Sequence, residues 1–302
     1  MQNQNTALQG SGAPQGARMG ILAGLSAYFI WGIAPLYFKA VAEIPLWEVL
    51  AQRVFWSLVV CLAFLAVLRR WGELKSAIRN PKTRLALTVS TVLITVNWSI
   101  YIWAVAEGRV LEASLGYYIN PLLNVALGVL VLKERLSRFQ AIAVALAALG
   151  VLNQAVTLGH PPWVALSLGI SFALYGLVRK RAPVESLTGL TVETGIVAPF
   201  ALGYMVWLGM TGHSSYGDSW TTDLLLIGFG PLTAVPLLLF AIAARRLKLS
   251  TLGFMQYLAP TLQFLLALTV WREPFTWVQG ITFGLIWAGL VFYSLDALRP
   301  KA

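Results

Sequence analysis

The chain has 302 residues, of which 58% are hydrophobic and only 11% are charged, and its mean hydropathy is +0.73. Because soluble domains carry about 25% charged residues, most of this chain cannot face water, and we predict an integral membrane protein. The single cysteine, Cys61, excludes an intrachain disulfide. The formal net charge of +10 would suit a nucleic-acid partner, but the basic residues are distributed as in a membrane topology, so no nucleic-acid partner is expected.

Residues 1–18 (MQNQNTALQGSGAPQGAR) are polar and rich in glycine, and we expect a disordered cytoplasmic tail. A cleavable signal peptide needs an apolar stretch followed by a processing site. Neither is visible in this segment, so the first membrane helix is expected to be retained.

Ten apolar stretches follow in chain order. A stretch of roughly 17 to 25 apolar residues crosses the hydrocarbon core as a helix, so the sequence predicts an all-α integral membrane protein with about ten transmembrane helices. The breaks AEGRV and REPFT are very short, which leaves nine or eleven helices open. The expected spans are residues 20–39, 46–68, 85–106, 110–132, 137–156, 162–178, 186–210, 223–243, 249–271 and 276–295.

Lysine and arginine are distributed unevenly between the two sides of these spans. Cytoplasmic segments of membrane proteins carry an excess of both residues, and 18 of the 22 fall on one side if the amino terminus lies inside. We therefore expect both termini in the cytoplasm. The 18 residues are Arg18, Arg69, Arg70, Lys75, Arg79, Lys82, Arg84, Lys133, Arg135, Arg138, Arg179, Lys180, Arg181, Arg245, Arg246, Lys248, Arg299 and Lys301.

The two halves of the chain resemble each other. WAVAEGRVLEASLG (103–116) aligns without gaps to FAIAARRLKLSTLG (240–253), and YINPLLN then matches YLAPTLQ. Further along, Lys133-Glu134 matches Arg272-Glu273, and Gln140 matches Gln279. Five spans in each half place the halves in opposite orientations, an arrangement whose substrate site lies near the midplane at the repeat interface. We predict two inverted five-helix repeats, in residues 19–156 and 157–298.

The most distinctive segments are WGIAPLYFK, NWSIYIWAVAEGRVLEASLGYYINPL, YGLVRK, LTVET and LSTLGFMQYLAPTLQFLLA. Through them the chain resembles the RarD-like branch of the EamA family, in the drug/metabolite transporter superfamily, from about residue 19 to residue 298. The resemblance implies a ten-helix bacterial inner-membrane protein built from two EamA-type repeats. It also implies export or exchange of small metabolites or drugs by alternating access.

Ionisable side chains inside the spans are the first candidates for the site. Placing one at the bilayer centre costs roughly 2.5 to 3.5 kcal/mol on insertion scales, so a partner or a wet cavity is expected. Arg53 lies in the second span and Glu193 at a similar depth in the seventh. We hypothesise that both face a central cavity, or each other, with Arg53 binding a substrate carboxylate and Glu193 an amine or a coupling proton. The alternative is a structural pair that pins helices. Glu48, nearer the outer end of the second span, is expected at the membrane interface.

Polar and aromatic residues surround two matched prolines. A proline in a membrane helix removes a backbone hydrogen bond and bends the helix, so the freed carbonyl can line a cavity. Pro121 and Pro260 are therefore predicted to bend both halves. Side chains with an apolar body and a polar handle suit an organic-solute pocket, although they also serve in ordinary packing and in the interface belt. The candidates for cavity lining are Trp31, Asn97, Trp98, Tyr101, Tyr117, Tyr118, Asn120, Tyr175, Gln256 and Tyr257.

The leading hypothesis is a secondary transporter for small organic solutes, with proton coupling through Glu193 as an option. The sequence has no Walker-type loop, no paired metal-ligand spacing and no Gly-x-Ser-x-Gly elbow, so no cofactor, metal or enzymatic activity is expected. A channel is the alternative. A membrane-embedded lipid-modifying enzyme is less favoured, because the carboxylates and histidines are scattered. The expected partners are a metabolite-like, amino-acid-like or drug-like substrate, membrane lipid and, as an option, a second copy in a homodimer.

Overall fold

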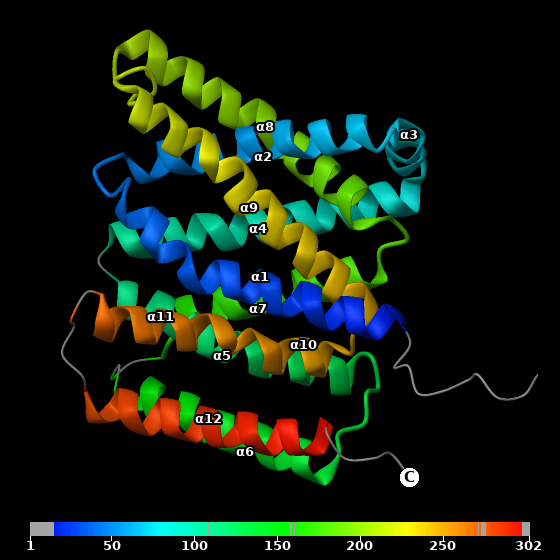
Figure 1. Ribbon diagram of the computed structural model, residues 1–302, viewed down its shortest axis with the longest axis vertical. Coiled ribbons are helices and arrows are strands. Elements are labelled where there is room, and N and C mark those ends of the chain that lie inside the picture. The colour runs from blue at the N-terminus through cyan, green and yellow to red at the C-terminus, as the bar shows by residue number, and fades with distance from the viewer. Residues whose placement is uncertain are drawn as a thin grey trace, which may run out of the picture.

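The computed structural model describes residues 15–297, except residues 108, 158, 160, 271 and 273–275. Within these residues every regular element is a helix (Figure 1), as the sequence predicts. The helices are α1 (Gln15–Lys39), α2 (Leu46–Val67), α3 (Trp71–Arg79), α4 (Pro81–Ala106), α5 (Val110–Leu130), α6 (Arg138–Val156), α7 (Trp163–Arg181), α8 (Ser186–Thr211), α9 (Trp220–Arg246), α10 (Leu249–Gln256), α11 (Leu258–Thr269) and α12 (Trp277–Ala297).

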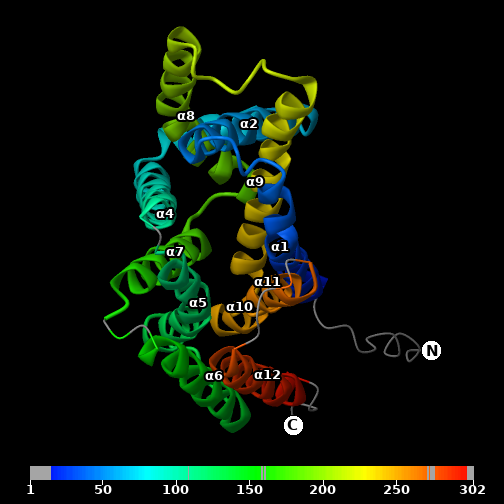
Figure 2. The same cartoon turned by 90° about the vertical axis from the view of Figure 1, so that its left-hand side faces the viewer.

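Seven helical segments of the described chain are long and apolar enough to cross a membrane. They are α1, α2, α6, α8, α9, α10 together with α11, and α12. The other expected spans coincide with α4, α5 and α7, which carry polar side chains along their length, such as Ser90, Thr95 and Asn97 in α4. Polar groups at membrane depth face the protein interior or a wet cavity. Accordingly Ser90 of α4, Asn124 of α5 and Ser171 of α7 are buried, although α4 and α7 lie along one flank of the bundle (Figure 2).

The long helices lie side by side across the view of Figure 1. The start of α1 and the end of α12 lie on the same side, at the right of that figure, which we call the terminal side; the opposite side is the distal side. In the end-on view of Figure 2, α6 packs against α12 at one end of the molecule and α2 against α8 at the other. The remaining long helices lie between these two pairs.

Two helices begin with reciprocal capping. At the start of α6, the backbone nitrogens of Gln140 and Ser137 donate to the Ser137 hydroxyl and the Gln140 side-chain oxygen, each at 3.1 Å. At the start of α12, the backbone nitrogen of Gln279 donates to the Thr276 hydroxyl at 3.3 Å, and that of Thr276 donates to the Gln279 side-chain oxygen at 3.1 Å. Each capping box satisfies two backbone donors that a helix start leaves free.

The helices differ from the sequence-based expectations in three places. Helix α1 begins at Gln15 rather than after residue 18, because residues 15–18 include good helix formers; residues 1–14 of the expected tail lie outside the described residues. Helix α3 was not expected, and its Ala77 packs against Leu87. The expected span 249–271 is divided into α10 and α11, because Pro260 has no N–H to donate to the Gln256 carbonyl.

Small residues bring helices from the two halves of the chain into close contact. Gly253 in α10 packs on the backbone of α5, and a Cβ at this position would lie 2.6 Å from the carbonyl oxygen of Pro121. Only glycine fits this approach, as is common where membrane helices pack closely. Pro121 itself lies inside α5, which continues through it to Leu130.

Candidate functional site

A cavity of about 250 Å³ lies in the centre of the bundle. Its described lining comes from α1, α2, α4 and α5 in the first half of the chain, and from α7, α9, α10 and α11 in the second. Most of these residues belong to the middle or the distal part of their helices. Nine residues proposed from the sequence line the cavity: Trp31, Arg53, Asn97, Trp98, Tyr101, Tyr117, Asn120, Gln256 and Pro260.

Arg53 is the charged residue among the described residues that line the cavity. Helix α2 carries it inward, between two aromatic rings: its Cζ lies 5.4 Å from the ring centroids of both Phe38 and Trp98. The Nε of Arg53 donates to the hydroxyl of Thr233 in α9 at 3.2 Å. A guanidinium beside aromatic faces is attracted by the ring quadrupole, so these contacts hold the cation in place without neutralising it.

Amide side chains surround the cavity and are held by neighbouring helices. The Nδ2 of Asn97 donates to the Leu168 carbonyl at 2.8 Å and to the Ser171 hydroxyl at 3.0 Å, which ties α4 to α7. The Nδ2 of Asn124 donates to the Oε1 of Gln256 at 2.9 Å, which ties α5 to α10. Within the described part of the chain these bonds use the Nδ2 of Asn97 and the Oε1 of Gln256, so the Oδ1 of Asn97 and the Nε2 of Gln256 are left for a ligand.

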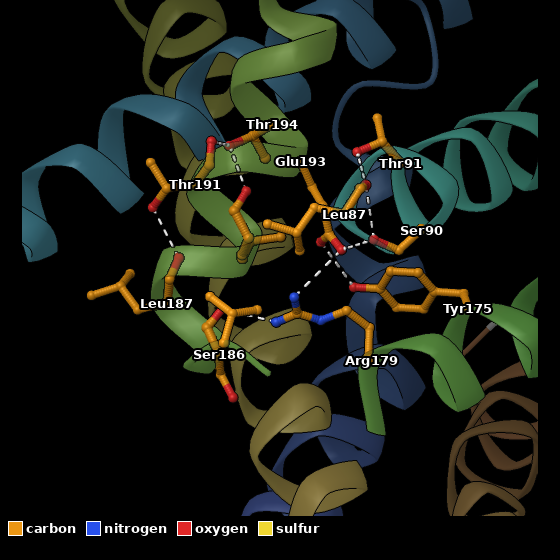
Figure 3. Close-up of polar contacts among 12 residues, drawn as sticks. Leu87, Ser90, Thr91, Tyr175, Arg179, Ser186, Leu187, Thr191, Glu193 and Thr194 are labelled. Carbon is orange, nitrogen blue, oxygen red and sulfur yellow. Dashed lines mark hydrogen bonds and ion pairs between the residues drawn. The ribbon is translucent and has the colours of Figure 1, made fainter. Parts of the chain in front are cut away.

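Glu193 lies outside this cavity, in a separate buried cluster (Figure 3). Its Oε1 is 3.5 Å from the Nη1 of Arg179, and the two side chains are 3% and 1% exposed. The hydroxyl of Ser90 donates to the same oxygen, and the hydroxyl of Tyr175 donates to Oε2 at 3.3 Å. Figure 3 shows these side chains from α4, α7 and α8 pointing toward one another.

Arg179 reaches Glu193 because α8 carries a glycine beside it. A Cβ at Gly189 would lie 1.9 Å from the Nη1 of Arg179, so any larger residue would displace the guanidinium. The Nη2 of Arg179 donates to the Ser186 carbonyl at 3.0 Å, at the first turn of the same helix. The pair therefore joins α7 to α8 in the interior, where an ion pair requires good geometry to offset desolvation.

The structure does not bring Arg53 and Glu193 together. Each binds a different partner, since Arg53 faces α9 and the cavity whereas Glu193 faces α4 and α7. The space next to Glu193 is a pocket of about 10 Å³, which is room for about one water molecule. A substrate amine on Glu193 and a carboxylate on Arg53 therefore have no common site in this conformation.

Four other sequence candidates lie between helices rather than on the cavity. The ring of Tyr175 stacks on that of Phe240, with centroids 6.0 Å apart and an angle of 15°. The hydroxyl of Tyr257 donates to the Tyr118 carbonyl at 3.3 Å, and the Pro121 carbonyl faces Gly253. In these contacts the four residues pack between helices, which is the alternative to cavity lining that the sequence left open.

Polar contacts join the helices on the terminal side. The Nζ of Lys180, near the end of α7, donates to the carbonyls of Ala244, at 3.1 Å, and Leu247. The carboxylate of Glu134 accepts from the backbone nitrogens of Leu249 and Ser250, at 2.7 and 3.0 Å, and so caps the start of α10. None of these described residues lines the cavity.

Sequence reasoning missed several residues of these sites. Thr233 carried no signal, because isolated threonines are common in membrane helices. Arg179 lies in the run VRKR and was counted with the basic residues at the cytoplasmic end. The buried Glu193 could have indicated that it needs a cation from a nearby helix. Glu48 is fully buried and accepts from the backbone nitrogen of Ser215 at 2.9 Å, so it holds the loop between α8 and α9.

A central cavity lined by aromatic rings and a few polar side chains, inside a bundle of apolar helices, is suited to binding a small organic molecule within the membrane. Residues 18–153 match the EamA-like transporter family. The sequence is 48% identical to an "Uncharacterized transporter" of Vibrio cholerae, over 94% of this chain and 95% of that protein. It is 47% identical to "Protein RarD" of Escherichia coli, over 94% of this chain and 96% of that protein. A crystal structure of 22% sequence identity has a TM-score of 0.71, covers 94% of this chain and 100% of its own, and bears on the fold alone.

The chain therefore belongs to the EamA-like transporter family, as a RarD-like member of the drug/metabolite transporter superfamily. This confirms the resemblance inferred from its sequence. With seven apolar helices in its described part and bacterial relatives, it is a multi-pass protein of the bacterial inner membrane. Membership also implies a small-molecule substrate and a lipid environment.

Proposed function

We propose that the chain is a secondary transporter that exports or exchanges small organic solutes by alternating access. The observation that carries this proposal is the 250 Å³ cavity, whose lining comes from both halves of the chain and combines aromatic rings with a cation and amides. Such a lining offers apolar area together with polar handles for an organic solute.

Two inverted five-helix repeats, with ten spans in total, are part of the proposal. Local structure at matched positions supports them. The capping boxes of α6 and α12 occupy positions that the sequence alignment pairs, and the two helices start on opposite sides of the molecule (Figure 1). Lys133 and Arg272, also paired by the alignment, both have left-handed backbone, with φ of 58° and 52°. Non-glycine residues rarely adopt this conformation, so its recurrence favours a true repeat.

We place the terminal side in the cytoplasm, because most basic residues lie there. The cavity would then face outward, and the contacts of Lys180 and Glu134 would close the cytoplasmic side. A closed side supports alternating access over a continuous channel. Inward opening would require these contacts to break. The homodimer, which the sequence left as an option, stays a prediction.

Glu193 is the proposed proton-coupling residue, because it is a buried carboxylate outside the solute cavity and joins two helices. The test uses purified protein in liposomes that hold a pH dye, with a panel of metabolites, amino acids and small drugs. Substrate-dependent proton movement is expected in the wild type and is lost in Glu193→Gln. The matched control is Glu43→Gln, an exposed glutamate in the loop after α1, which should behave as the wild type.

Two results would count against parts of this proposal. Solute flux without proton movement in all three proteins would contradict the role of Glu193 and leave a facilitator or exchanger. The absence of flux for every solute would contradict transport itself.

A further inference from the structure

We propose that the cavity binds a small organic monoanion, with its acidic group on Arg53 and its aromatic or apolar body against the surrounding rings. The inference rests on the proposed function in one respect: the bound anion is a transported substrate only if the chain is a transporter. Binding of the anion can be tested without transport. It goes further than the sequence-based hypothesis, which gave Arg53 a substrate carboxylate and left Glu193 to bind either a substrate amine or a coupling proton.

The first argument is the charge of the cavity. A guanidinium has five N–H donors, and within the described part of the chain the hydrogen bonds of Arg53 are limited to the one from Nε to Thr233. Both Nη atoms are therefore available, and they present the planar pair of donors that binds a carboxylate or sulfonate in two places. Arg53 is half-buried and faces the cavity. A charge taken out of bulk water needs a counter-charge, and the described lining contains no aspartate or glutamate.

The second argument concerns the amine of a zwitterion. Glu193, which lies at a similar depth in its own span, is paired with Arg179 and does not line the cavity. An ammonium group in the cavity would therefore meet Arg53 as a like charge, and no described carboxylate would offset it. The lining favours an anion over an amino acid, and disfavours a cation most.

The third argument is shape and hydrogen bonding. The volume of about 250 Å³ lies just below the roughly 300 to 1,000 Å³ of pockets for drug-sized ligands, so a single-ring solute fits best. Trp98 and Phe38 flank the cation. Within the described chain, the side chain of Gln256 takes part in one hydrogen bond, which its Oε1 accepts from Asn124, and its Nε2 donates to no described residue. That donor would bind a further acceptor on the ligand.

The test compares ring compounds that differ in charge. Binding of benzoate, benzamide, benzylamine and phenylalanine to the purified wild type is measured by calorimetry and by quenching of tryptophan fluorescence. Truncating one partner of a buried charged contact weakens binding by about 30-fold or more, so benzoate should bind at least that much more tightly than neutral benzamide. Benzylamine and phenylalanine should bind more weakly than benzoate. Equal or tighter binding of phenylalanine or benzylamine would overturn the inference.

Variants then locate the acidic group. Arg53→Gln should lose about 30-fold or more in benzoate affinity. Arg53→Lys should lose less, because the positive charge remains although the two-point geometry of the guanidinium is lost. Thr233→Val removes the partner of Nε and should weaken benzoate binding with little effect on benzamide. The matched control is Arg246→Gln, an exposed arginine outside the cavity, which should leave affinity unchanged. Thermal unfolding of every variant shows which ones remain folded, and the wild-type comparison decides the question without any variant.

Flux separates this inference from the proposed function. Benzenesulfonate remains ionised and does not cross lipid as a neutral acid, so its counterflow in proteoliposomes reports the protein alone. Flux of neutral or cationic solutes with no binding of benzoate or benzenesulfonate would overturn the anion site and keep the transporter. Arg53-dependent anion binding with no flux of any solute would keep the anion site and overturn the transporter.

Discussion

The buried pair of Arg179 and Glu193 gives the sharpest stability prediction. The side chains are 1% and 3% exposed, with Nη1 and Oε1 3.5 Å apart. Removing one partner of a buried pair costs about 3 to 5 kcal/mol, because the other charge is left uncompensated. Ser90 and Tyr175 would still donate to Glu193 in Arg179→Met, so we expect a loss near 3 kcal/mol for this variant. The same loss is expected for Glu193→Gln, in which Arg179 keeps, among its contacts with described residues, the bond to Ser186.

The double variant is the decisive comparison. Arg179→Met with Glu193→Gln removes both charges, so its loss should be smaller than the sum of the two single losses by about 2 to 3 kcal/mol. Thermal unfolding in detergent, followed by tryptophan fluorescence, measures all three. At about 2 to 4 °C per kcal/mol for chains of 150 to 250 residues, each single variant should lower Tm by about 6 to 12 °C.

A partly exposed ion pair provides the control. The ion pair of Arg245 and Glu185 has side chains that are 27% and 53% exposed, and exposed pairs contribute about 0 to 1 kcal/mol. Arg245→Met should therefore lower Tm by less than about 4 °C. If the buried single variants lose no more than this control, or if their losses simply add in the double variant, the reasoning about the buried pair is refuted.

Three further predictions follow from packing, capping and burial. Gly253→Ala places a Cβ 2.6 Å from the Pro121 carbonyl oxygen and should destabilise the protein by about 1 to 3 kcal/mol. In the control Gly203→Ala, in α8, the new Cβ meets nothing within 4 Å, and this variant should be more stable than the wild type by up to about 1 kcal/mol. Equal changes in Tm for the two variants would contradict the close approach of Gly253 to α5. Ser137→Ala and Thr276→Ala each remove a capping hydroxyl and should each cost about 1 kcal/mol by thermal unfolding; no loss at either site would show that the cap adds nothing there. Cys61 is fully buried, so a thiol reagent followed by mass spectrometry should label it only after denaturation; rapid labelling of the folded protein would contradict its placement.

Much of the helical architecture can be read from hydropathy, because each apolar stretch must bury its backbone polar groups within a helix. The departures have local causes that hydropathy does not register. Pro260 divides one expected span into α10 and α11. The short helix α3 is amphipathic and packs Ala77 against Leu87, but with nine residues it is too short and too polar to be found as a membrane span.

The site was only partly predictable, for a related reason. The position of Arg53 within an apolar span identified it as a charge inside the membrane. That position gives no information on which face of the helix packs against which neighbouring helix. Arg53 therefore could not be assigned to Thr233, nor Glu193 to Arg179, from spacing alone. Tyr118 and Tyr257 carry the same chemistry as Tyr117, and only the packing of α5 against α10 separates those that line the cavity from those that do not.

Helices α6 and α12 contribute no described residue to the cavity, and α12 packs chiefly against α6. Selection for a different solute therefore acts on other helices and leaves this pair under packing constraints alone. Related proteins can differ in the solute that they bind while the interface between α6 and α12 stays unchanged. Grafting a new cavity lining onto this scaffold should succeed most readily where that interface is left intact.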